Sequence, residues 1–296
     1  MSTVYTIENE LLKVSVTTWG AQVCSVRRKC DGVEHIWQAD SSVWGYHAPI
    51  LFPYAGRLAE GKCEAKDTVW ENAPPHGFAR TSEHRFVRQN ETTIVLELTD
   101  SPETLALWPY KFRLTSYFIL DGDSLTHRLE VENRDEAPLP FGIGYHPAFT
   151  IPFSEGHTAS DYEFRFEKKQ SPLCIDCLPK GLVSGKCYYL GSNIDTIPLT
   201  ETLFANDSFC MTNLTADTLA IYEKGTGRGV VCGFSGFPYN LIWSKPDWTT
   251  PFVCIEPWQS LPSAEGASPR WEEKPAAAIL QPGEKWHCDL NTRFVR

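Results

Sequence analysis

Apolar and polar side chains alternate along many short segments of this sequence, and residues typical of turns separate the segments. The clearest case is Ser124–Asn133, where every second position carries an apolar side chain or a histidine: Leu125, His127, Leu129 and Val131. The segment Phe112–Leu120 precedes it, and the Asp-Gly-Asp sequence at 121–123 suits a tight turn. A period of two is that of a β-strand with one buried face. The sequence therefore predicts an antiparallel hairpin here, with His127 facing the core or lining a cleft.

The same alternation predicts strands over nine further segments: Leu11–Thr18, Gln22–Arg28, Val33–Gln38, Asp161–Phe166, Leu219–Tyr222, Gly229–Gly233, Leu241–Ser244, Phe252–Glu256 and Trp286–Arg293. Asp31–Gly32 is expected to form the turn into the third of them. Helical periodicity is scarce, although Ser101–Leu105 has the serine, proline and acidic first turn of a helix start. We predict an all-β fold, a large antiparallel β-sandwich with few short helices. Because no linker or internal repeat divides the chain, we expect a single domain over residues 1–296.

Charge and composition exclude several classes of protein. The net charge is −10 and the pI is near 5.3, which disfavours surfaces for nucleic acids and anionic membranes. No apolar run approaches the roughly 20 residues of a membrane helix, and Met1–Val4 has no signal-peptide pattern. We therefore expect a cytoplasmic monomer or homodimer with no nucleic-acid or membrane partner.

The 10 cysteines are scattered along the chain, as expected for free thiols in a reducing compartment. Cys174 and Cys177 form a CxxC pair. A structural zinc site needs a second pair of ligands at a suitable spacing, and the sequence offers none. It also has no motif for a covalent nucleophile, a phosphate-binding loop or a carboxylate-rich metal loop. We predict no metal and no cofactor.

The stretch Phe141–Phe149 is mostly apolar and holds one ionisable imidazole, His146, between two glycines and a proline. Glycine permits close backbone approach, and proline restricts the residue before it, so the imidazole is held on a stiff segment. Two interpretations are open from these residues. His146 is either an acid or base held for proton transfer, or a core histidine bonded to a backbone carbonyl.

Two other stretches place a charged or titratable side chain among prolines and aromatic residues. Trp44–Arg57 is too irregular for a strand, and Arg57 at its end is either a surface arginine or a donor to sugar hydroxyls or an oxyanion. Pro74–Arg80 mounts His76 between prolines and a glycine. Two histidines with less constrained surroundings rank below it: His47 and His84.

Glu256 follows the apolar segment Phe252–Ile255 and precedes a proline, so we expect the strand to end there. A carboxylate in this place is either simply solvated or buried and paired, and burial raises its pKa toward that of a useful base. Trp258 offers an apolar platform for the C–H face of a sugar ring. A carboxylate, histidines, an arginine and tryptophans together suit binding a polar ring and moving protons on it.

The order of these motifs resembles the aldose 1-epimerases (mutarotases) of the galactose-mutarotase-like superfamily, and within it the LacX-type branch. The resemblance covers nearly the whole chain through a series of short motifs: Glu8–Leu12, Trp44–Gly45, Phe52–Arg57, His76–Arg80, Gly144–Phe149 and Glu256–Trp258. It implies a β supersandwich with the sugar in an open cleft and with no cofactor.

The resemblance also implies a role for individual residues. Glu256 matches the general base that takes the proton of the anomeric hydroxyl, and His146 matches the acid that protonates the ring oxygen from the opposite side of the ring. His76 matches a second active-site histidine, Arg57 a substrate-binding arginine, and Asp207 an aspartate that binds sugar hydroxyls. We expect an anionic Glu256 to favour the charged form of His146.

One departure from the family bears on the substrate. Galactose mutarotases proper carry a glycine pair after the first histidine, whereas this chain has Gly77–Arg80 with the sequence Gly-Phe-Ala-Arg, as hexose-6-phosphate mutarotases and the LacX group do. A free aldohexose and a hexose 6-phosphate therefore both stay open as substrates. Arg80 either binds a phosphate or pairs with an acid such as Glu83 as part of the scaffold.

Two other functions also stay open. A glycoside hydrolase or lyase needs two carboxylates, about 5–10 Å apart for hydrolysis, and Asp207 is the one credible partner for Glu256. A non-catalytic sugar-binding or sensor protein of the same fold would keep the tryptophans and Arg57 but lose the pair of Glu256 and His146, which this chain retains.

Overall fold

The computed structural model describes residues 2–177, 181–246, 251–274 and 278–296, and most of its regular structure is antiparallel β-sheet. A nine-stranded sheet has the order β17 (Ile194–Pro198), β14 (Tyr162–Gln170), β19 (Thr218–Glu223), β20 (Gly229–Gly233), β24 (Lys285–Val295), β10 (Ser124–Asn133), β9 (Phe112–Asp121), β8 (Thr93–Thr99) and β7 (Arg85–Gln89). An eight-stranded sheet has the order β16 (Cys187–Tyr189), β15 (Leu173–Ile175), β18 (Phe209–Thr212), β21 (Tyr239–Trp243), β22 (Phe252–Trp258), β12 (Gly144–Tyr145) and β4 (Ile50–Leu51), with β13 (Ala148–Thr150) also paired to β22.

Smaller elements complete the fold. A three-stranded sheet contains β1 (Val4–Glu8), β2 (Leu12–Thr17) and β3 (Gln22–Arg28), and two further pairs join β5 (Cys63–Ala65) to β6 (Thr68–Trp70) and β11 (Leu139–Phe141) to β23 (Ala278–Leu280). The helical elements are short: α1 (Pro102–Leu107), η1 (Ala59–Gly61), η2 (Ala79–Thr81), η3 (Ala159–Asp161) and η4 (Trp271–Glu273).

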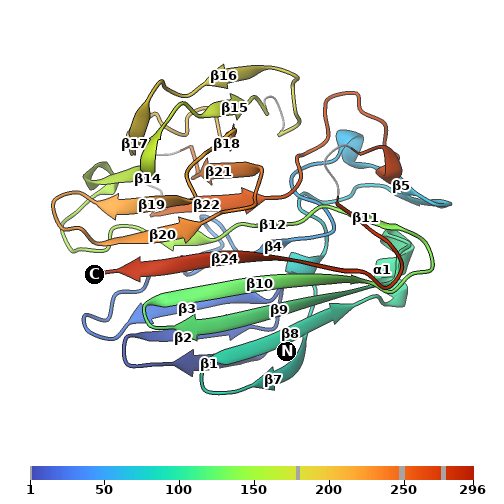
Figure 1. Ribbon diagram of the computed structural model, residues 1–296, viewed down its shortest axis with the longest axis horizontal. Helices are drawn as coiled ribbons and strands as arrows, with labels where there is room; N and C mark the ends of the chain where they lie inside the picture. The colour runs from blue at the N-terminus through green and yellow to red at the C-terminus, as the bar shows by residue number, and fades with distance from the viewer. Residues whose placement is uncertain (1, 178–180, 247–250, 275–277) are drawn as a thin grey trace.

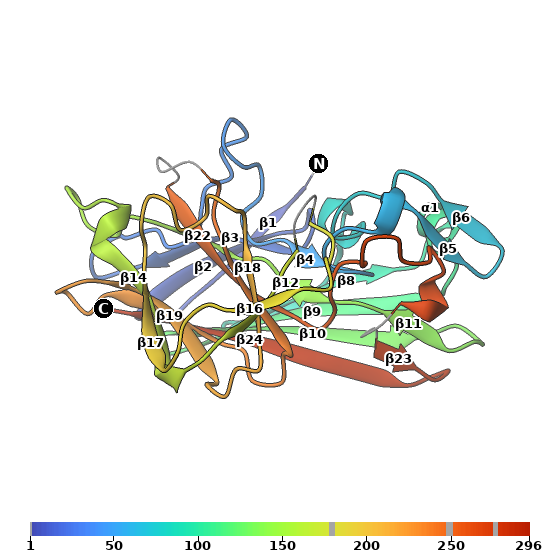
Figure 2. The same ribbon diagram turned by 90° about the horizontal axis from the view of Figure 1, so that it is seen from above.

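The two large sheets pack against each other and confirm the predicted β-sandwich (Figure 1). Seen from above, β22 runs across the direction of β24 (Figure 2). Leu129 of β10, Leu290 of β24 and Ile255 of β22 belong to one buried cluster. The hydroxyl of Tyr145 on β12 also lies 2.7 Å from the carbonyl oxygen of His127 on β10, so a buried hydrogen bond joins the sheets. The site described below is built on the eight-stranded side of this core.

Most of the predicted strands are confirmed. The predicted hairpin is formed by β9 and β10, which pair from Ser124 opposite Asp121 to Asn133 opposite Phe112. The predicted helix start is also confirmed, because the Ser101 side chain accepts a hydrogen bond from the Thr104 backbone N–H in a capping box at the start of α1. These elements have strong local signals, either a period of two or a helix cap. Their prediction therefore did not depend on distant parts of the chain.

Two expectations about strands were wrong. Residues 33–38 form no strand and make only isolated bridges, because the Glu34 carboxylate accepts the backbone N–H groups of Val26 (2.9 Å) and Ile36 (3.0 Å) in place of a continuous ladder. Strand β22 does not end at Glu256 but continues to Trp258, because its pairing with β21 extends past Pro257.

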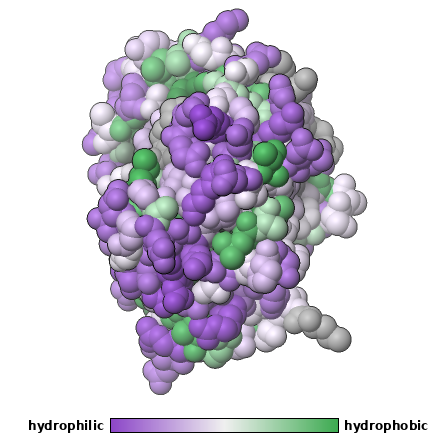
Figure 3. Space-filling model, turned by 90° about the vertical axis from the view of Figure 1, so that its right-hand side faces the viewer, coloured by the Kyte–Doolittle hydropathy of each residue, from purple (hydrophilic) through white to green (hydrophobic). Residues whose placement is uncertain are grey.

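Buried hydrophobic residues form one large cluster that includes Ile7 near the start of the chain and Phe294 near its end. The single domain over residues 1–296 remains a prediction. One face of the molecule is mostly hydrophilic, with apolar residues in small groups (Figure 3). Among the residues that the structure describes, no helix is long and apolar enough to cross a membrane. The cytoplasmic location also remains a prediction.

A buried carboxylate, Glu223, ties the end of β19 to neighbouring loops. The side chain is 1% exposed, and it accepts hydrogen bonds from the hydroxyls of Tyr162 (2.6 Å), Thr226 (2.8 Å) and Ser154 (2.9 Å). Burial alone would raise the pKa of Glu223, but these hydrogen bonds outweigh it and the pKa lies below its usual value. The ionised form of Glu223 therefore stabilises the folded protein.

We expect Glu223→Gln to lower the free energy of unfolding at neutral pH by about 1.5–3 kcal/mol, because hydrogen bonds to a charged group are lost. The pKa of Glu223 is lowered in the folded state, so its contribution is present above the unfolded pKa and is lost as pH falls through the folded pKa. Denaturant unfolding of wild type and Glu223→Gln from pH 7 to pH 3 measures this. The exposed Glu71→Gln is the control, and a gap between wild type and Glu223→Gln that stays constant with pH would contradict the assignment.

Candidate active site

Strand β22 carries a carboxylate into the interior of the protein. All of its residues are buried. Val253 and Ile255 point into the main hydrophobic cluster, whereas Cys254 packs in a second cluster on the other face. Because successive side chains of a strand alternate, Glu256 shares the face of Cys254. Glu256 is 1% exposed, so of the two alternatives that the sequence left open, the buried carboxylate is the one that the structure shows.

The register of the sheet brings His146 opposite Glu256. On one edge of β22, Gly144 pairs with Trp258 and Ala148 pairs with Cys254, and continuing this register places His146 beside Glu256. Side chains directly opposite each other on neighbouring strands lie on one face and in contact. Accordingly, His146 Nε2 lies 3.3 Å from a carboxylate oxygen of Glu256. Of the two interpretations of His146, the geometry favours the one with a chemical partner.

Aromatic rings enclose the imidazole of His146. Trp44 stacks on it with ring centroids 5.0 Å apart, and Trp243 and His76 approach it edge-on at 5.6 and 5.5 Å. Burial, and then the positive charge of Arg80, lower the pKa of His146 to about 3. This direction runs against the charged imidazole that we expected, because loss of solvation is the largest effect on His146.

The carboxyl of Glu256 shifts in the opposite direction. Burial, and then the negative charge of Asp207, raise the pKa of Glu256 well above its usual range. Both shifts favour the neutral forms of the two side chains, because burial penalises a charge on either one. A neutral imidazole next to a carboxylic acid is a matched acceptor and donor of protons.

A second histidine, His76, is fixed by the backbone of another stretch. The Gly56 N–H donates to His76 Nδ1 at 3.1 Å, and the His76 N–H donates to the Gly56 carbonyl at 2.8 Å. Burial, and then His146, lower the pKa of His76 well below its usual value, so the ring is neutral. Because Nδ1 accepts a hydrogen bond, the proton lies on Nε2. His76 therefore presents a fixed N–H donor.

Gly77 allows the two stretches to meet. The carbonyl oxygen of Phe52 accepts hydrogen bonds from the N–H groups of Phe78 and Ala79, both at 3.1 Å. A Cβ atom on Gly77 would lie 2.3 Å from that oxygen, and Gly77 has a φ of +69°. Only glycine fits this backbone position without displacement.

A cleft of about 360 Å³ opens over the pair. Its lining includes every residue that the sequence assigned to the site: Glu256, His146, His76, Arg57, Asp207, Arg80 and Trp258. This volume is within the range of small-molecule sites. The residues come from distant stretches of the chain, and the structure brings them together.

The polar residues of the cleft differ in exposure. Arg57 and Asp207 are exposed, whereas Arg80 is half-buried and its guanidinium lies 4.7 Å above the ring of Tyr46. Within the described residues Arg80 makes no ion pair with Glu83 or another acid, and its Nε is buried without a hydrogen-bond partner. Trp258 is 4% exposed, so it forms a wall of the cleft more than an open platform.

Sequence reasoning missed several lining residues. Trp44 and Tyr46 lie in the aromatic stretch that it singled out, but no role was assigned to them. Trp243 and Lys245 also line the cleft. Leu241 pairs with Glu256, so the two side chains lie on the same face of the sheet. Trp243 and Lys245 follow Leu241 at intervals of two residues, and this spacing is the signal that places them on that face.

Most of the other residues considered from the sequence lie outside the lining. His47 Nδ1 is 2.7 Å from the Trp37 carbonyl and His84 Nε2 is 3.1 Å from the Ala79 carbonyl, as expected for structural histidines. His127 is buried and stacks on Phe118 with centroids 4.2 Å apart. Of the CxxC pair, Cys174 is buried and Cys177 lines the cleft.

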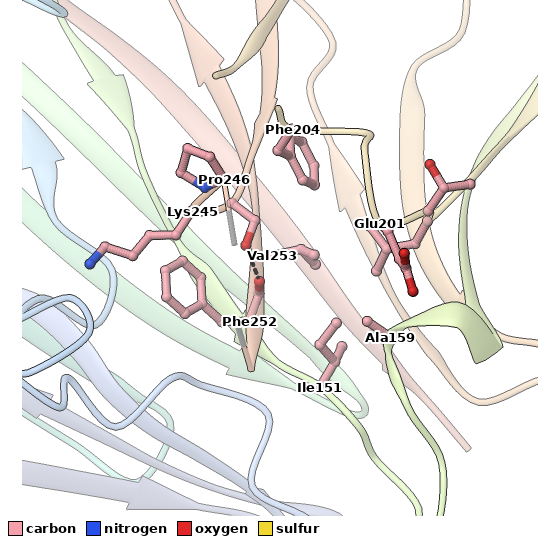
Figure 4. Close-up of a pocket in the computed structure, with 11 residues that line it drawn as sticks. Ile151, Ala159, Glu201, Phe204, Lys245, Pro246, Phe252 and Val253 are labelled. Carbon is pink, nitrogen blue, oxygen red and sulfur yellow. Dashed lines mark hydrogen bonds between the residues drawn. The ribbon is translucent and has the colours of Figure 1, made fainter. Parts of the chain in front are cut away.

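A smaller cavity lies beside the cleft, on the other side of Lys245 (Figure 4). The Ser244 hydroxyl donates to the Phe252 carbonyl at 2.7 Å there, and the Lys245 side chain points away from Glu201. Its volume is about 20 Å³, which is room for about one water molecule. The cleft of about 360 Å³, which Glu256, His146 and His76 line, is therefore the candidate for binding a sugar.

Known proteins resemble this chain over nearly its full length. The profile of the family described as aldose 1-epimerase matches residues 3–292. The plasmid-encoded protein LacX of Lactococcus lactis subsp. lactis is 30% identical over 284 residues, which cover 93% of this chain and 94% of LacX.

Solved structures agree with this similarity. A galactose mutarotase related enzyme from Lactobacillus acidophilus has a TM-score of 0.94 at 27% identity, with 99% of this chain and 98% of that chain covered. A galactose mutarotase-like protein from Lactobacillus casei has a TM-score of 0.91 at 25% identity, with 98% and 99% covered.

Gly77→Ala tests the link between the two stretches. We expect it to lower the free energy of unfolding by more than about 1 kcal/mol and to abolish most activity, because the Phe52 carbonyl must move and His76 moves with it. Gly32→Ala is the matched control, since Gly32 has a φ of +72° but open space around a Cβ atom. Thermal unfolding and anomer-exchange rates of both variants measure the effects. Equal losses of activity in both would contradict a special role for Gly77.

Proposed function

Because this chain belongs to the aldose 1-epimerase family and is of its LacX type, we propose that it interconverts the α and β anomers of an aldohexose by general acid–base opening and closure of the ring. The observation that carries this proposal is the contact of 3.3 Å between His146 Nε2 and the Glu256 carboxylate at the base of the cleft.

Ring opening moves two protons, one at each of the two oxygen atoms that are bonded to C1. A proton leaves the anomeric hydroxyl O1, a proton arrives at the ring oxygen O5, and the C1–O5 bond breaks to give the aldehyde. We expected the acid and the base on opposite sides of the ring, but His146 and Glu256 are in contact in the lining of the cleft. Two adjacent groups can serve O1 and O5, because both oxygens are bonded to C1. Rotation about C1–C2 and the reverse transfers close the ring on the other face and restore the pair. Each placed group contributes about 10²- to 10⁴-fold to the rate.

One proton on the pair is sufficient in either arrangement. With the proton on His146, Glu256 is the base for O1 and His146 the acid for O5. With the proton on Glu256, Glu256 is the acid for O5 and His146 the base for O1. In either arrangement, microscopic reversibility requires ring closure to return the protons through the same two groups. His76 donates its Nε2 proton to an oxygen of the substrate, and Arg57 and Asp207 bind hydroxyl groups.

The alternative functions fit the site less well. Glycoside hydrolysis uses two carboxylates that flank the bond, but Asp207 is exposed whereas Glu256 contacts a histidine. A non-catalytic binder has no use for a buried acid–base pair, which is costly to desolvate.

A hexose 6-phosphate is a second candidate substrate, and one observation favours it. Arg80 lines the cleft and has no acidic partner among the described residues. Its Nε is also buried without a hydrogen-bond partner. A phosphate would supply charge-assisted hydrogen bonds to this guanidinium. In a free sugar, an uncharged hydroxyl group would take the place of the phosphate, and the guanidinium of Arg80 can donate hydrogen bonds to it as well.

Glu256→Gln should lower kcat at least about 100-fold and keep sugar binding, because the amide keeps the shape but transfers no proton. NMR measurement of anomer exchange gives the rate, and calorimetric titration with the sugar gives the affinity. Glu223→Gln, a change at a buried carboxylate away from the cleft, should keep wild-type activity. Exchange by Glu256→Gln within about tenfold of wild type would remove Glu256 from the proton transfer.

Arg80→Ala separates the two substrate classes. If Arg80 binds phosphate, the variant should have a lower kcat/KM for glucose 6-phosphate and galactose 6-phosphate. The decrease should correspond to about 1.5–3 kcal/mol of lost transition-state binding. The kcat/KM for the free sugars should stay the same. Arg88→Ala on β7, an exposed arginine, is the control. Equal losses for both classes would indicate that Arg80 maintains the site and that a neutral sugar is the substrate.

A further inference from the structure

Cys254 lies next to the acid–base pair, but proton transfer does not use it. It precedes Glu256 by two residues on the same face of β22, and it is opposite Ala148, two residues after His146. The three side chains are buried. One ligand atom from each, an imidazole nitrogen, the Cys254 sulfur and a carboxylate oxygen, lies within 4.8 Å of the other two.

These three atom types form a recognised donor set for a zinc-like ion. Zinc binds thiolate, imidazole and carboxylate in tetrahedral geometry, and sites with three protein ligands keep one position open. Hard ions such as Mg²⁺ and Ca²⁺ prefer oxygen ligands alone, so the thiol selects against them.

The observed spacing also fits. Zn–N and Zn–O bonds of about 2.0–2.2 Å at the tetrahedral angle separate the two ligand atoms by roughly 3.3–3.5 Å. His146 Nε2 and the Glu256 oxygen are 3.3 Å apart. With a Zn–S bond of about 2.3 Å, the same geometry places the sulfur roughly 3.5–3.7 Å from the other two ligand atoms. Because the sulfur lies within 4.8 Å of both, it has to approach them by at most about 1.3 Å. The open fourth position would face the cleft, where Glu256 and His146 both line the wall.

We propose that His146, Cys254 and Glu256 form an inhibitory site for a thiophilic divalent cation of the zinc class. The cation takes the lone pair of His146 and the oxygen of Glu256, and its binding releases the thiol proton of Cys254 and the proton held by the pair. No acid or base is then left for a sugar. The binding itself does not depend on the proposed function, whereas the inhibition rests on it.

The other cysteines provide controls. Cys232 on β20 is as fully buried as Cys254 but lies in the main hydrophobic cluster. Cys177 lines the cleft, yet in the described part of the chain it belongs to no group of three possible ligands. Cys254→Ala, Cys232→Ala and Cys177→Ser therefore separate the proposed site from burial and from a thiol elsewhere in the cleft.

The test titrates the full-length protein with Co²⁺ and Zn²⁺ after treatment with a chelator. Wild type should bind one Co²⁺ with the absorption of a tetrahedral ion and a thiolate charge-transfer band. Cys254→Ala should lose that band and bind Zn²⁺ at least about tenfold more weakly. Cys232→Ala and Cys177→Ser should keep both the thiolate band and the wild-type affinity for Zn²⁺. Cys254→Ser, whose hydroxyl is a poor zinc ligand, repeats the measurement if the alanine variant does not fold.

Anomer exchange gives the second readout. Zn²⁺ should inhibit wild type, and Cys254→Ala should need at least about tenfold more Zn²⁺ for the same inhibition while its rate in chelator matches wild type. Absence of Co²⁺ and Zn²⁺ binding by wild type, or a thiolate band that survives in Cys254→Ala and disappears in Cys177→Ser, would overturn the proposal. An inactive wild type that still shows the band through Cys254 would refute the proposed function and leave the metal site standing.

Discussion

The burial of the Glu256 carboxyl inside a strand without exposed residues is the constraint on which the site depends. A buried ionised carboxylate without a partner costs several kcal/mol. The raised pKa of Glu256 and the lowered pKa of His146 reduce this cost, because both shifts favour uncharged side chains. The aromatic rings around His146 then keep water out and maintain both shifts in pKa.

Much of the fold could be predicted, because its signals are local. The alternation in β9 and β10 and the cap at Ser101 specify their elements without reference to the rest of the chain. The strand predicted at residues 33–38 failed because Glu34, a side chain, takes the place of a backbone partner. The end of β22 was misplaced because pairing with a distant strand outweighs the local effect of Pro257.

Residues that line the cleft could be named from the sequence, but their electrostatics could not. Motifs around His146, His76 and Glu256 identified the groups that line the cleft. The direction of the His146 pKa depends on burial by Trp44 and Trp243, and the latter lies almost 100 residues further along the chain. The contact of Glu256 with His146 depends on the register of β12 and β13, which are too short to have a periodic signal.

The two halves of the site are held by different parts of the architecture. Backbone pairing in the eight-stranded sheet fixes Glu256 and His146, whereas Arg57 and Asp207 lie in connecting segments and Arg80 in the 3-10 turn η2. Connecting segments tolerate substitutions and insertions better than paired strands do. Under the proposed function, sugar preference can therefore diverge during evolution while the proton-transfer chemistry is inherited unchanged, and one scaffold can serve several metabolic routes.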